Sequence, residues 1–193
     1  KSQEKLCCPI EVLFFHNPSD SHLLLDDSNL FKDLINEFEV NTLGVSVYEP
    51  WEVNKLLGCN LNLAFQFPFN ALDKRFENIK MQKGFRYARS VFLQGLLASR
   101  KQLKSGVPLE LFKLQKLYHS KLVELNLSPI KYALSFVYHN PTVDYFLLGV
   151  ASINQLKQLI DIDLYSQRDF DMLSGIKFET NEYWIDPRNW RIK

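Results

Sequence analysis

The stretch Val-Leu-Phe-Phe-His-Asn-Pro, residues 12–18, sets a pattern that recurs along the whole chain. Four apolar residues stand without interruption, a histidine follows, and Asn-Pro then ends any regular element. Because the strands of a parallel sheet are buried on both faces, this run after Pro9 predicts a buried strand at 10–16. His16, at the end of the strand, is either a hydrogen-bonded structural residue or a residue at the mouth of a site.

Strand and helix signals alternate along the rest of the chain. Apolar runs predict strands at 10–16, 43–48, 61–67, 85–89 and 144–150. Apolar residues at helical spacing, with Ser, Pro or Gly at the ends, predict helices at 28–38, 50–57, 72–83, 111–125, 128–138, 152–160 and 166–174, and the tail at 179–193 is expected to be irregular but packed. This alternation is typical of an α/β fold, in which helices cover a parallel sheet.

Several single residues carry structural predictions of their own. Ser28 can cap the helix at 28–38, because a serine side chain accepts a hydrogen bond from a free backbone N–H at a helix start. Gly58 is expected to end its helix in the left-handed conformation that glycine adopts easily. The remaining histidines, His22, His119 and His139, are expected on the surface or in loops.

Composition and charge exclude several classes of protein. The 193 residues carry 23 basic and 22 acidic side chains, and the net charge of +1 gives no general attraction to nucleic acid or to an anionic membrane. No apolar run approaches the about 20 residues that span a bilayer, and we expect no secretory signal. Cys7, Cys8 and Cys59 lack the spacing of a disulfide framework or a zinc site. We therefore expect a single cytoplasmic domain over residues 1–193, with reduced thiols and no metal.

Five parallel strands in a chain of this length fit an open doubly wound sheet or part of a barrel. No Gly-x-Gly-x-x-Gly follows a predicted strand, no Walker-type Gly-Lys-Ser/Thr is present, and the chain has only seven glycines. The nucleotide-binding open sheets are therefore the weaker alternative. In a (β/α)8 barrel, functional residues lie at the C-terminal ends of the strands.

Each predicted strand has polar residues or a glycine near or just after its C-terminal end. They are His16, Ser46, Gln66, Arg89, Ser90, Gly149, Ser152 and Gln155. A single polar residue at a strand end is usually structural, because a buried polar group costs free energy unless it is paired. Five strands with such groups at the same end point instead to one shared site.

The sequence resembles the C-terminal part of the aldo-keto reductases. The similar stretches, in order, are VLFFHNP (12–18), LGVSVYEP (43–50), FQFPFN (65–70), RSVFLQGLL (89–97) and VDYFLLGVASINQL (143–156). The resemblance implies a (β/α)8 TIM-barrel fold, here a partial barrel that supplies strands four to eight with their flanking helices. It also implies that NADPH lies across the C-terminal face and that an aldehyde or ketone is reduced there.

In this family an Asp, a Tyr, a Lys and a His carry the acid–base chemistry. The resemblance makes His16 the histidine of that tetrad, and its neighbour Asn17 is the candidate substrate contact. The Asp, Tyr and Lys belong to strands one to three, which have no counterpart in these residues. The chain alone is therefore expected to be inactive, and the parent protein is expected to be the enzyme.

The resemblance also assigns contacts to the nicotinamide and the phosphates. Ser46 and Gln66 correspond to residues that bind the carboxamide, although Val47 stands where many members have Asn. Arg89 and Ser90 correspond to the segment near the pyrophosphate and the nicotinamide ribose.

The adenosine end is assigned to the segment after the last strand. Gly149, Ser152 and Gln155 correspond to it, and Leu159 lies about where members often have an Asn near the adenine. No clear arginine for the 2′-phosphate is present, so the resemblance implies NADP(H) or NAD(H) as the cofactor.

Three hypotheses follow from the sequence. The leading one is an aldo-keto reductase-like oxidoreductase that acts on a small carbonyl substrate. The second is a non-catalytic barrel that binds NADP and serves a regulatory role. The third is a degenerate half-barrel that self-associates through unpaired sheet edges, either as a homodimer or with a missing N-terminal half.

Overall fold

The computed structural model describes residues 5–81, 83–99 and 107–190. The strands are β1 (Ile10–Phe15), β2 (Val40–Ser46), β3 (Ala64–Pro68), β4 (Arg86–Arg89) and β5 (Tyr145–Phe146). The helices are η1 (Pro18–His22), α2 (Leu23–Asp26), α3 (Ser28–Phe38), α4 (Pro50–Leu57), α5 (Leu109–Glu124), α6 (Pro129–Tyr138), α7 (Ile153–Ile160), α8 (Gln167–Leu173), α9 (Glu182–Ile185) and η2 (Pro187–Asn189).

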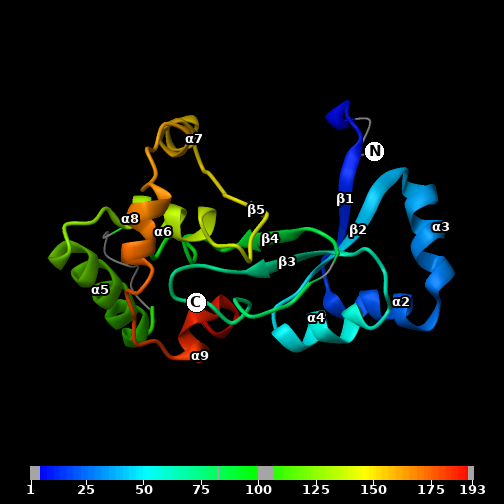
Figure 1. Ribbon diagram of the computed structural model, residues 1–193, viewed down its shortest axis with the longest axis horizontal. Helices are drawn as coiled ribbons and strands as arrows, with labels where there is room; N and C mark the ends of the chain where they lie inside the picture. Colours follow the sequence, from blue (N-terminus) through cyan, green and yellow to red (C-terminus); the bar gives the residue numbers. More distant parts are fainter. Residues whose placement is uncertain (1–4, 82, 100–106, 191–193) are drawn as a thin grey trace.

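The five strands form one parallel sheet in the order of the sequence, β1-β2-β3-β4-β5. Figure 1 shows the sheet across the middle of the molecule, with α2, α3 and α4 beside β1 and β2 and with α5, α6 and α8 at the other end. Within the described residues, β1 and β5 are the edges of this sheet. The predicted α/β class and the parallel sheet are confirmed.

One face of the sheet packs into the main core. Val45, Phe65 and Ala88 point to this face from three neighbouring strands and are fully buried. They join helix residues such as Tyr118 of α5 and Tyr132 of α6 in a single hydrophobic cluster. Because alternate residues of a strand point to opposite faces, this packing fixes which residues point to the other face.

The opposite face carries an aromatic layer. Phe14 lies edge-on to Tyr87, with ring centroids 5.4 Å apart, and Tyr87 stacks on Tyr145 at 5.0 Å. Gly44 makes room for Phe14, since a Cβ on this glycine would lie 2.5 Å from the phenylalanine ring. Tyr145 and Phe85 each remain 49% exposed, so this layer is only partly covered.

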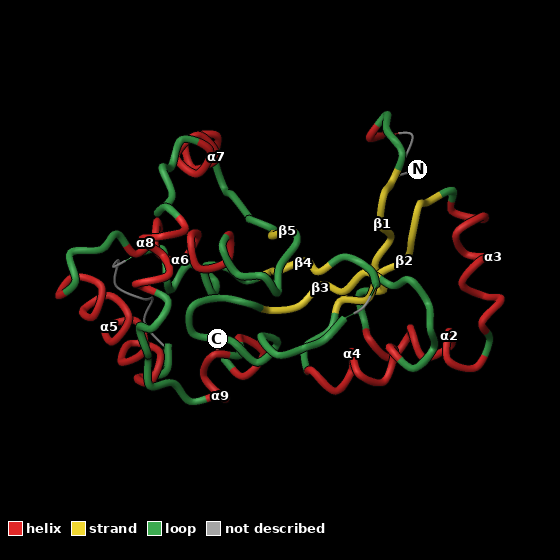
Figure 2. Tube along the Cα trace, in the orientation of Figure 1, coloured by secondary structure: helices red, strands yellow, loops and turns green. Residues whose placement is uncertain are grey.

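The predicted helix at 72–83 is wrong in the described part of that segment, which forms turns (Figure 2). The Asn70 side chain accepts hydrogen bonds from the backbone N–H groups of Leu72 and Asp73 at 3.0 Å each. Such side-chain-to-backbone bonds compete with helix formation. Phe76 stacks on Phe67, which holds the irregular segment against the core.

Smaller predictions also need correction. The predicted strand at 144–150 is reduced to Tyr145–Phe146, and its last bond to β4 runs from the Leu147 N–H to the Ala88 carbonyl at 2.8 Å. Asp27 caps α3 by accepting a hydrogen bond from the Asn29 N–H at 2.9 Å, in the place predicted for Ser28. Gly58 does end α4, but with right-handed angles of φ −63° and ψ −20°.

The histidine predictions were partly wrong. His119 lies on the inner side of α5 with 5% exposure, and its Nε2 is 3.0 Å from the Leu96 carbonyl oxygen. His139 follows α6 and stacks on Phe170, so it is partly buried rather than a plain surface residue. The contacts with Leu96 and Phe170 join residues that are distant in the sequence, so a pattern of nearby residues could not reveal this burial.

The described part of the C-terminal tail, residues 179–190, packs against the core as expected, but it contains the short helices α9 and η2 rather than being wholly irregular, and residues 191–193 lie outside the described chain. Ile185 enters the core with 3% exposure, and the Trp190 indole N–H donates to the Trp184 carbonyl at 2.8 Å. No helix in the described part of the chain has the length and apolar character needed to cross a membrane.

Candidate functional site

Two predicted residues meet where β2 ends, beside the middle of β3. Ser46 is the last residue of β2 and lies opposite Gln66 in the sheet register. The Ser46 hydroxyl donates to Gln66 Oε1 at 3.3 Å, and the Val47 N–H donates to the Gln66 backbone carbonyl at 2.8 Å. The Gln66 side-chain NH2 forms no hydrogen bond with any other described residue, so it can still donate to a ligand.

Arg89 extends this group to the end of β4. Its guanidinium donates to the Val47 carbonyl at 3.0 Å and lies 4.3 Å from the centre of the Tyr48 ring. Burial lowers the pKa of Arg89, and the nearby charge of Arg188 also lowers it. No described carboxylate forms a salt bridge with Arg89, so this guanidinium is a cation that can attract an anionic ligand.

His16 lies beyond the end of β1. Phe15 pairs with Val45, so the same register places His16 level with Ser46. The His16 side chain is exposed and forms no hydrogen bond or ion pair with the rest of the described chain. Asn17 has a local role, because its side chain accepts a hydrogen bond from the Ser19 N–H at 3.3 Å and caps η1.

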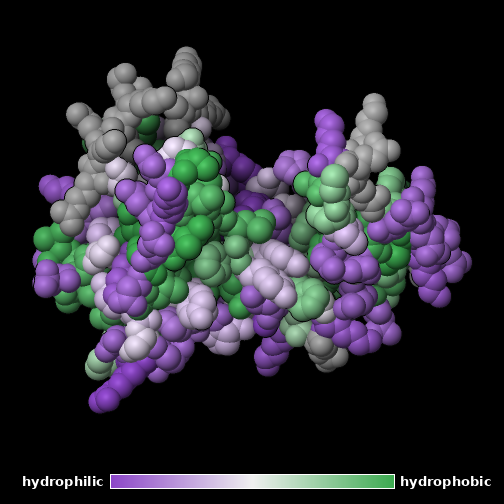
Figure 3. Space-filling model, turned by 90° about the horizontal axis from the view of Figure 1, so that it is seen from above, coloured by the Kyte–Doolittle hydropathy of each residue, from purple (hydrophilic) through white to green (hydrophobic). Residues whose placement is uncertain are grey.

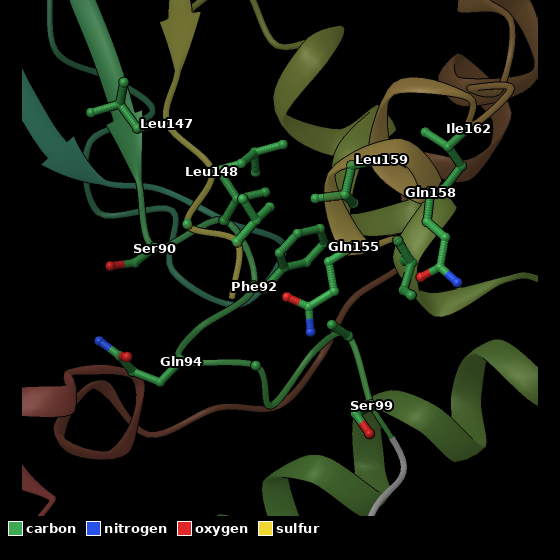
Figure 4. Close-up of a pocket in the computed structure, with 16 residues that line it drawn as sticks. Ser90, Phe92, Gln94, Ser99, Leu147, Leu148, Gln155, Gln158, Leu159 and Ile162 are labelled. Atoms are coloured by element: carbon green, nitrogen blue, oxygen red, sulfur yellow. The ribbon is translucent and has the colours of Figure 1, made fainter. Parts of the chain in front are cut away.

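A pocket of about 750 Å³ opens beyond the ends of β4 and β5 (Figure 4). The lining includes three of the predicted cofactor residues, Ser90, Gly149 and Gln155. Ser152 is not in the lining, and its side chain caps α7 by accepting a hydrogen bond from the Gln155 N–H at 3.2 Å. Gln155 in turn accepts a hydrogen bond from the Ala151 N–H at 2.8 Å, which fixes its side chain at the pocket.

The pocket is apolar and uncharged in its described lining. Phe92, Leu148 and Leu159 come from three different segments and surround the Gln155 side chain in Figure 4. The polar groups in the described lining are serine hydroxyls and glutamine amides. A site with apolar walls and a few hydrogen-bonding groups suits a flat, uncharged ring system.

The turn after β4 shapes the mouth of this pocket. Ser90, Leu93, Gln94 and Gly95 all have positive φ angles, between 44° and 87°. The buried Asn70 side chain donates to the Ser90 carbonyl at 3.1 Å and so holds the first of these residues. Left-handed angles at non-glycine residues cost free energy, and they occur often at functional sites.

Sequence reasoning missed a network of charges beside Arg89. Glu49 accepts hydrogen bonds from two arginines, from Arg75 at 3.1 Å and from Arg188 at 2.8 Å. Arg75 is also bound to Asp73, and Arg188 to Asp186, by paired hydrogen bonds.

Each of these arginines is held by an aspartate two residues before it. The Asp73 carboxylate accepts from the Arg75 backbone N–H at 3.3 Å, and the Asp186 carboxylate accepts from the Arg188 N–H at 3.0 Å. Both aspartates are almost completely buried. Asp-x-Arg occurs at both places in the sequence and is a signal that could have indicated the two turns.

The network also acts on the ionisation of its members. Hydrogen bonds with Asp73 raise the pKa of Arg75 well above its ordinary value. Burial by itself would raise the pKa of Asp186, but the hydrogen bonds and charge of Arg188 outweigh it and hold that pKa below the ordinary value. The carboxylate of the second Asp-x-Arg turn, Asp186, is therefore stable in the charged form.

The predicted residues fall into two neighbouring groups. One contains Ser46, Gln66 and Arg89, with His16 level with it, and the other contains Ser90, Gly149 and Gln155. Arg89 and Ser90 join the groups because they are adjacent in the chain. No group of histidine, cysteine and carboxylate side chains among the described residues could hold a metal ion.

No protein-family model matches the sequence, and no curated protein matches it. Solved structures do match the fold. The aldo-keto reductase AKR11C1 from Bacillus halodurans, in its holo form, superposes with a TM-score of 0.66 and 20% identity over 89% of this chain and 64% of that one. The apo form of the same protein gives a TM-score of 0.66 and 21% identity, with 65% of that chain covered.

A third match is the glycerol dehydrogenase AKR11B4 from Gluconobacter oxydans, with a TM-score of 0.62, 15% identity and 89% of this chain covered. The chain spans 60 to 65% of the length of these three structures. Its five parallel strands and flanking helices correspond to part of their barrels. The chain therefore has an aldo-keto reductase-like fold in the form of a partial barrel.

Proposed function

We propose that this chain forms the cofactor-binding part of an NAD(P)H-dependent oxidoreductase that reduces an aldehyde or ketone to an alcohol. The observation that carries the proposal is the Ser46–Gln66 pair, joined by a hydrogen bond at the C-terminal edge of the sheet. An amide that keeps its NH2 donor available beside a serine hydroxyl suits the carboxamide of a nicotinamide. The match of the fold to aldo-keto reductase structures supports the same function.

The other residues suit the remaining parts of a dinucleotide. Arg89 and Ser90 would contact the pyrophosphate, because a guanidinium without a carboxylate partner favours phosphate oxygens. Gly149 and Gln155 would hold the adenosine in the apolar pocket, and Ser152 would support them by capping α7. When bound, the nicotinamide supplies the hydride, and the protein orients its reactive face.

His16 would act on the substrate. Its imidazole would donate a hydrogen bond to the carbonyl oxygen, which gains negative charge as the carbonyl carbon accepts the hydride. Asn17 would provide a further substrate contact from the start of η1. The proton that completes the alcohol would come from the Tyr of the family's tetrad, for which these residues have no counterpart.

The pocket lining bears on the choice of cofactor. None of its described residues carries a positive charge that could bind a ribose 2′-phosphate. The proposal therefore includes NAD(H) as well as NADP(H). We also propose a cytoplasmic location, which the count and spacing of the cysteines support.

Titration with NADH and with NADPH, followed by fluorescence, tests the binding part of the proposal. The variants Ser46→Ala and Gln66→Ala each lose one hydrogen-bonding group, and we expect each to raise the dissociation constant by about three- to tenfold. The exposed residues Ser120 on α5 and Gln167 on α8 provide matched control variants, Ser120→Ala and Gln167→Ala. Failure of the folded wild-type chain to bind either nucleotide would contradict the proposal.

Mixing the chain with NADPH and an activated aldehyde separates binding from catalysis. We expect binding without loss of NADPH absorbance, because the tetrad is incomplete. Turnover by these 193 residues alone would refute the requirement for the family's Asp, Tyr and Lys. If a longer protein that also contains strands one to three still shows no turnover, that result would favour the non-catalytic, regulatory barrel.

The partly covered aromatic layer favours a second role for this surface, in assembly. Phe85 and Tyr145 are half exposed on the sheet face that would line a barrel interior, and β1 and β5 are edges in the described sheet. Since edge strands present unpaired backbone groups, we propose that strands from a missing N-terminal half, or from a second copy, complete the sheet. Analytical ultracentrifugation distinguishes a monomer from a homodimer.

A further inference from the structure

The C-terminal segment 181–190 reaches the candidate site from far along the sequence. Arg188 lies 139 residues after Glu49, and the two side chains are 2.8 Å apart. Figure 1 shows α9, at the C-terminal end of the described chain, next to the part of the molecule that contains β3 and α4. Ile185 enters the core, and Trp184 and Trp190 pack against it, so the segment is anchored on both sides of Arg188.

Arg188 and Arg89 share one aromatic ring. The guanidinium carbon of Arg188 lies 4.1 Å from the centre of the Tyr48 ring, and that of Arg89 lies 4.3 Å from it. A guanidinium over an aromatic face is attracted by the partial negative charge on that face of the ring. Among the described residues, Arg188 has two carboxylate partners, Asp186 and Glu49, whereas the Arg89 guanidinium contacts the Val47 carbonyl and this ring.

The backbone on both sides of Tyr48 is fixed as well. The Glu52 carboxylate accepts hydrogen bonds from the N–H groups of Tyr48 and Glu49, at 2.7 and 2.8 Å. On the other side, Val47 is bonded to Gln66 through its N–H and to Arg89 through its carbonyl. The Tyr48 ring is therefore the part of this loop whose orientation depends on the arginines beside it.

We propose that Arg188 is a positioning residue, which holds Tyr48 and thereby fixes the Arg89 guanidinium for a phosphate-bearing ligand. The inference rests on the proposed function in one respect, namely that Arg89 contacts the phosphates of the cofactor. The C-terminal segment would in this way tune ligand affinity without touching the ligand. Arg188 is suited to this role because its own charge is satisfied by Asp186 and Glu49.

The arginine Nε–H signals in NMR spectra of the full chain give a direct test. The Arg89 signal is identified by its loss in Arg89→Lys, and its position reports the ring of Tyr48. We expect Arg188→Ala and Tyr48→Leu both to move this signal. Tyr48→Phe, which keeps the ring, and Arg168→Ala, which removes an exposed arginine on α8, should leave it in place.

Titration with inorganic pyrophosphate, followed on the same signal, tests the effect on binding. We expect Arg188→Ala to raise the dissociation constant about two- to fivefold, as the loss of one cation–aromatic contact predicts. Arg188→Lys keeps the charge beside Asp186 and loses the planar group, so it should move the Arg89 signal while thermal unfolding stays near that of the wild type. This variant keeps the test valid if Arg188→Ala does not fold.

The possible outcomes separate this inference from the proposed function. An Arg89 signal that is the same in Arg188→Ala, Arg188→Lys and the wild type would overturn the positioning role, whatever the chain binds. A signal that moves in the variants, while NADH and NADPH fail to bind the wild type, would leave the positioning contact in place and refute the reductase proposal. Pyrophosphate affinity that is equal in all variants would overturn the link between Arg188 and ligand binding.

Discussion

Gly84 is the residue whose identity the backbone restricts most clearly. Its φ is +83°, and a Cβ at this position would lie 1.9 Å from the Leu63 carbonyl oxygen. Gly95 has a similar φ of +87° but has no atom within 4 Å of the same position. The two glycines therefore separate the cost of the backbone conformation from the cost of a collision.

Substituting each glycine by alanine measures both costs. We expect Gly95→Ala to lower the free energy of unfolding by about 1–2 kcal/mol, because an L-residue is strained in the left-handed region. Gly84→Ala should lower the free energy of unfolding clearly more than Gly95→Ala does, since the backbone next to β3 would have to shift as well. Urea unfolding of both variants checks this, and equal losses would show that the approach to Leu63 is not limiting.

Tyr132 of α6 should make the fold sensitive to alkali. Burial raises the pKa of Tyr132 to about 12, from an unfolded value of about 10. A raised pKa means that the folded state holds the proton more tightly than the unfolded state. The resulting contribution to the free energy of unfolding is complete below pH 10 and is lost as the pH rises towards 12. The total loss in the free energy of unfolding is about 2–3 kcal/mol.

Urea unfolding at pH 8 and pH 11 measures the part of this loss that occurs below pH 11. Tyr132→Phe removes the titrating hydroxyl, so its stability should fall less than that of the wild type over this range. Tyr138→Phe changes an exposed tyrosine at the end of the same helix and should behave like the wild type. The same pH dependence in all three proteins would argue against a role for Tyr132.

At the scale of elements, an ion pair adds to the backbone and aromatic contacts that hold β5 against β4. Asp144 accepts hydrogen bonds from the Arg86 backbone N–H at 2.9 Å and from its guanidinium at 2.8 and 2.9 Å. These bonds join β5, which has only two residues, to β4. The hydrogen bonds from Arg86 lower the pKa of Asp144, so the stabilisation is present above the ordinary carboxylate pKa and is lost as the pH falls through the lowered value.

Asp144→Asn should therefore destabilise the chain at neutral pH and flatten its acid dependence. Both partners are partly exposed, so we expect a loss of about 1 kcal/mol or less in the free energy of unfolding at pH 7. The difference from the wild type should shrink as the pH approaches 3. Asp163→Asn, at a carboxylate that is 97% exposed, serves as the control, and an equal effect there would contradict the special role of Asp144.

The elements that the sequence predicted well are those defined by local patterns. The apolar runs at β1 to β4 and the helical spacing in α3, α5 and α6 depend on neighbouring residues alone, so their positions were close. The helix at 72–83 failed because Asn70 and Asp73 bind nearby backbone and side-chain groups in turns. Sequence patterns carry no information about such competition until the partners are known.

The candidate site shows the same limit. Ser46 and Gln66 were found because each lies near the end of a predicted strand, and parallel strands bring their C-terminal ends to one edge. Arg188 was missed because its partner Glu49 lies 139 residues away. The resemblance to a family did not help there, since it did not extend to the tail.

At the scale of the whole molecule, the aromatic layer leaves an apolar surface open. Figure 3 shows the molecule hollowed between the part with β1 and α3 and the part with α5 to α8. Phe85, Tyr145 and Leu147 are between 44% and 49% exposed. Contiguous apolar surface of this kind usually marks a contact site.

The fluorescent dye ANS measures this surface in solution. We expect the folded chain to bind ANS at neutral pH, and Tyr145→Gln to weaken that binding. Leu117→Gln, at a similarly exposed apolar residue on α5, provides the control. A folded chain that does not bind ANS would show that this face is already covered in solution.

The order of the strands has a consequence for how the protein is made. Each strand pairs with the strand that follows it in the sequence, so the sheet can grow at one edge while the ribosome is still adding residues. The pairing of Glu49 with Arg188 is different, because it has to wait until residue 188 has left the exit tunnel. Synthesis would thus build the strand framework first and lock the loop at Tyr48 last.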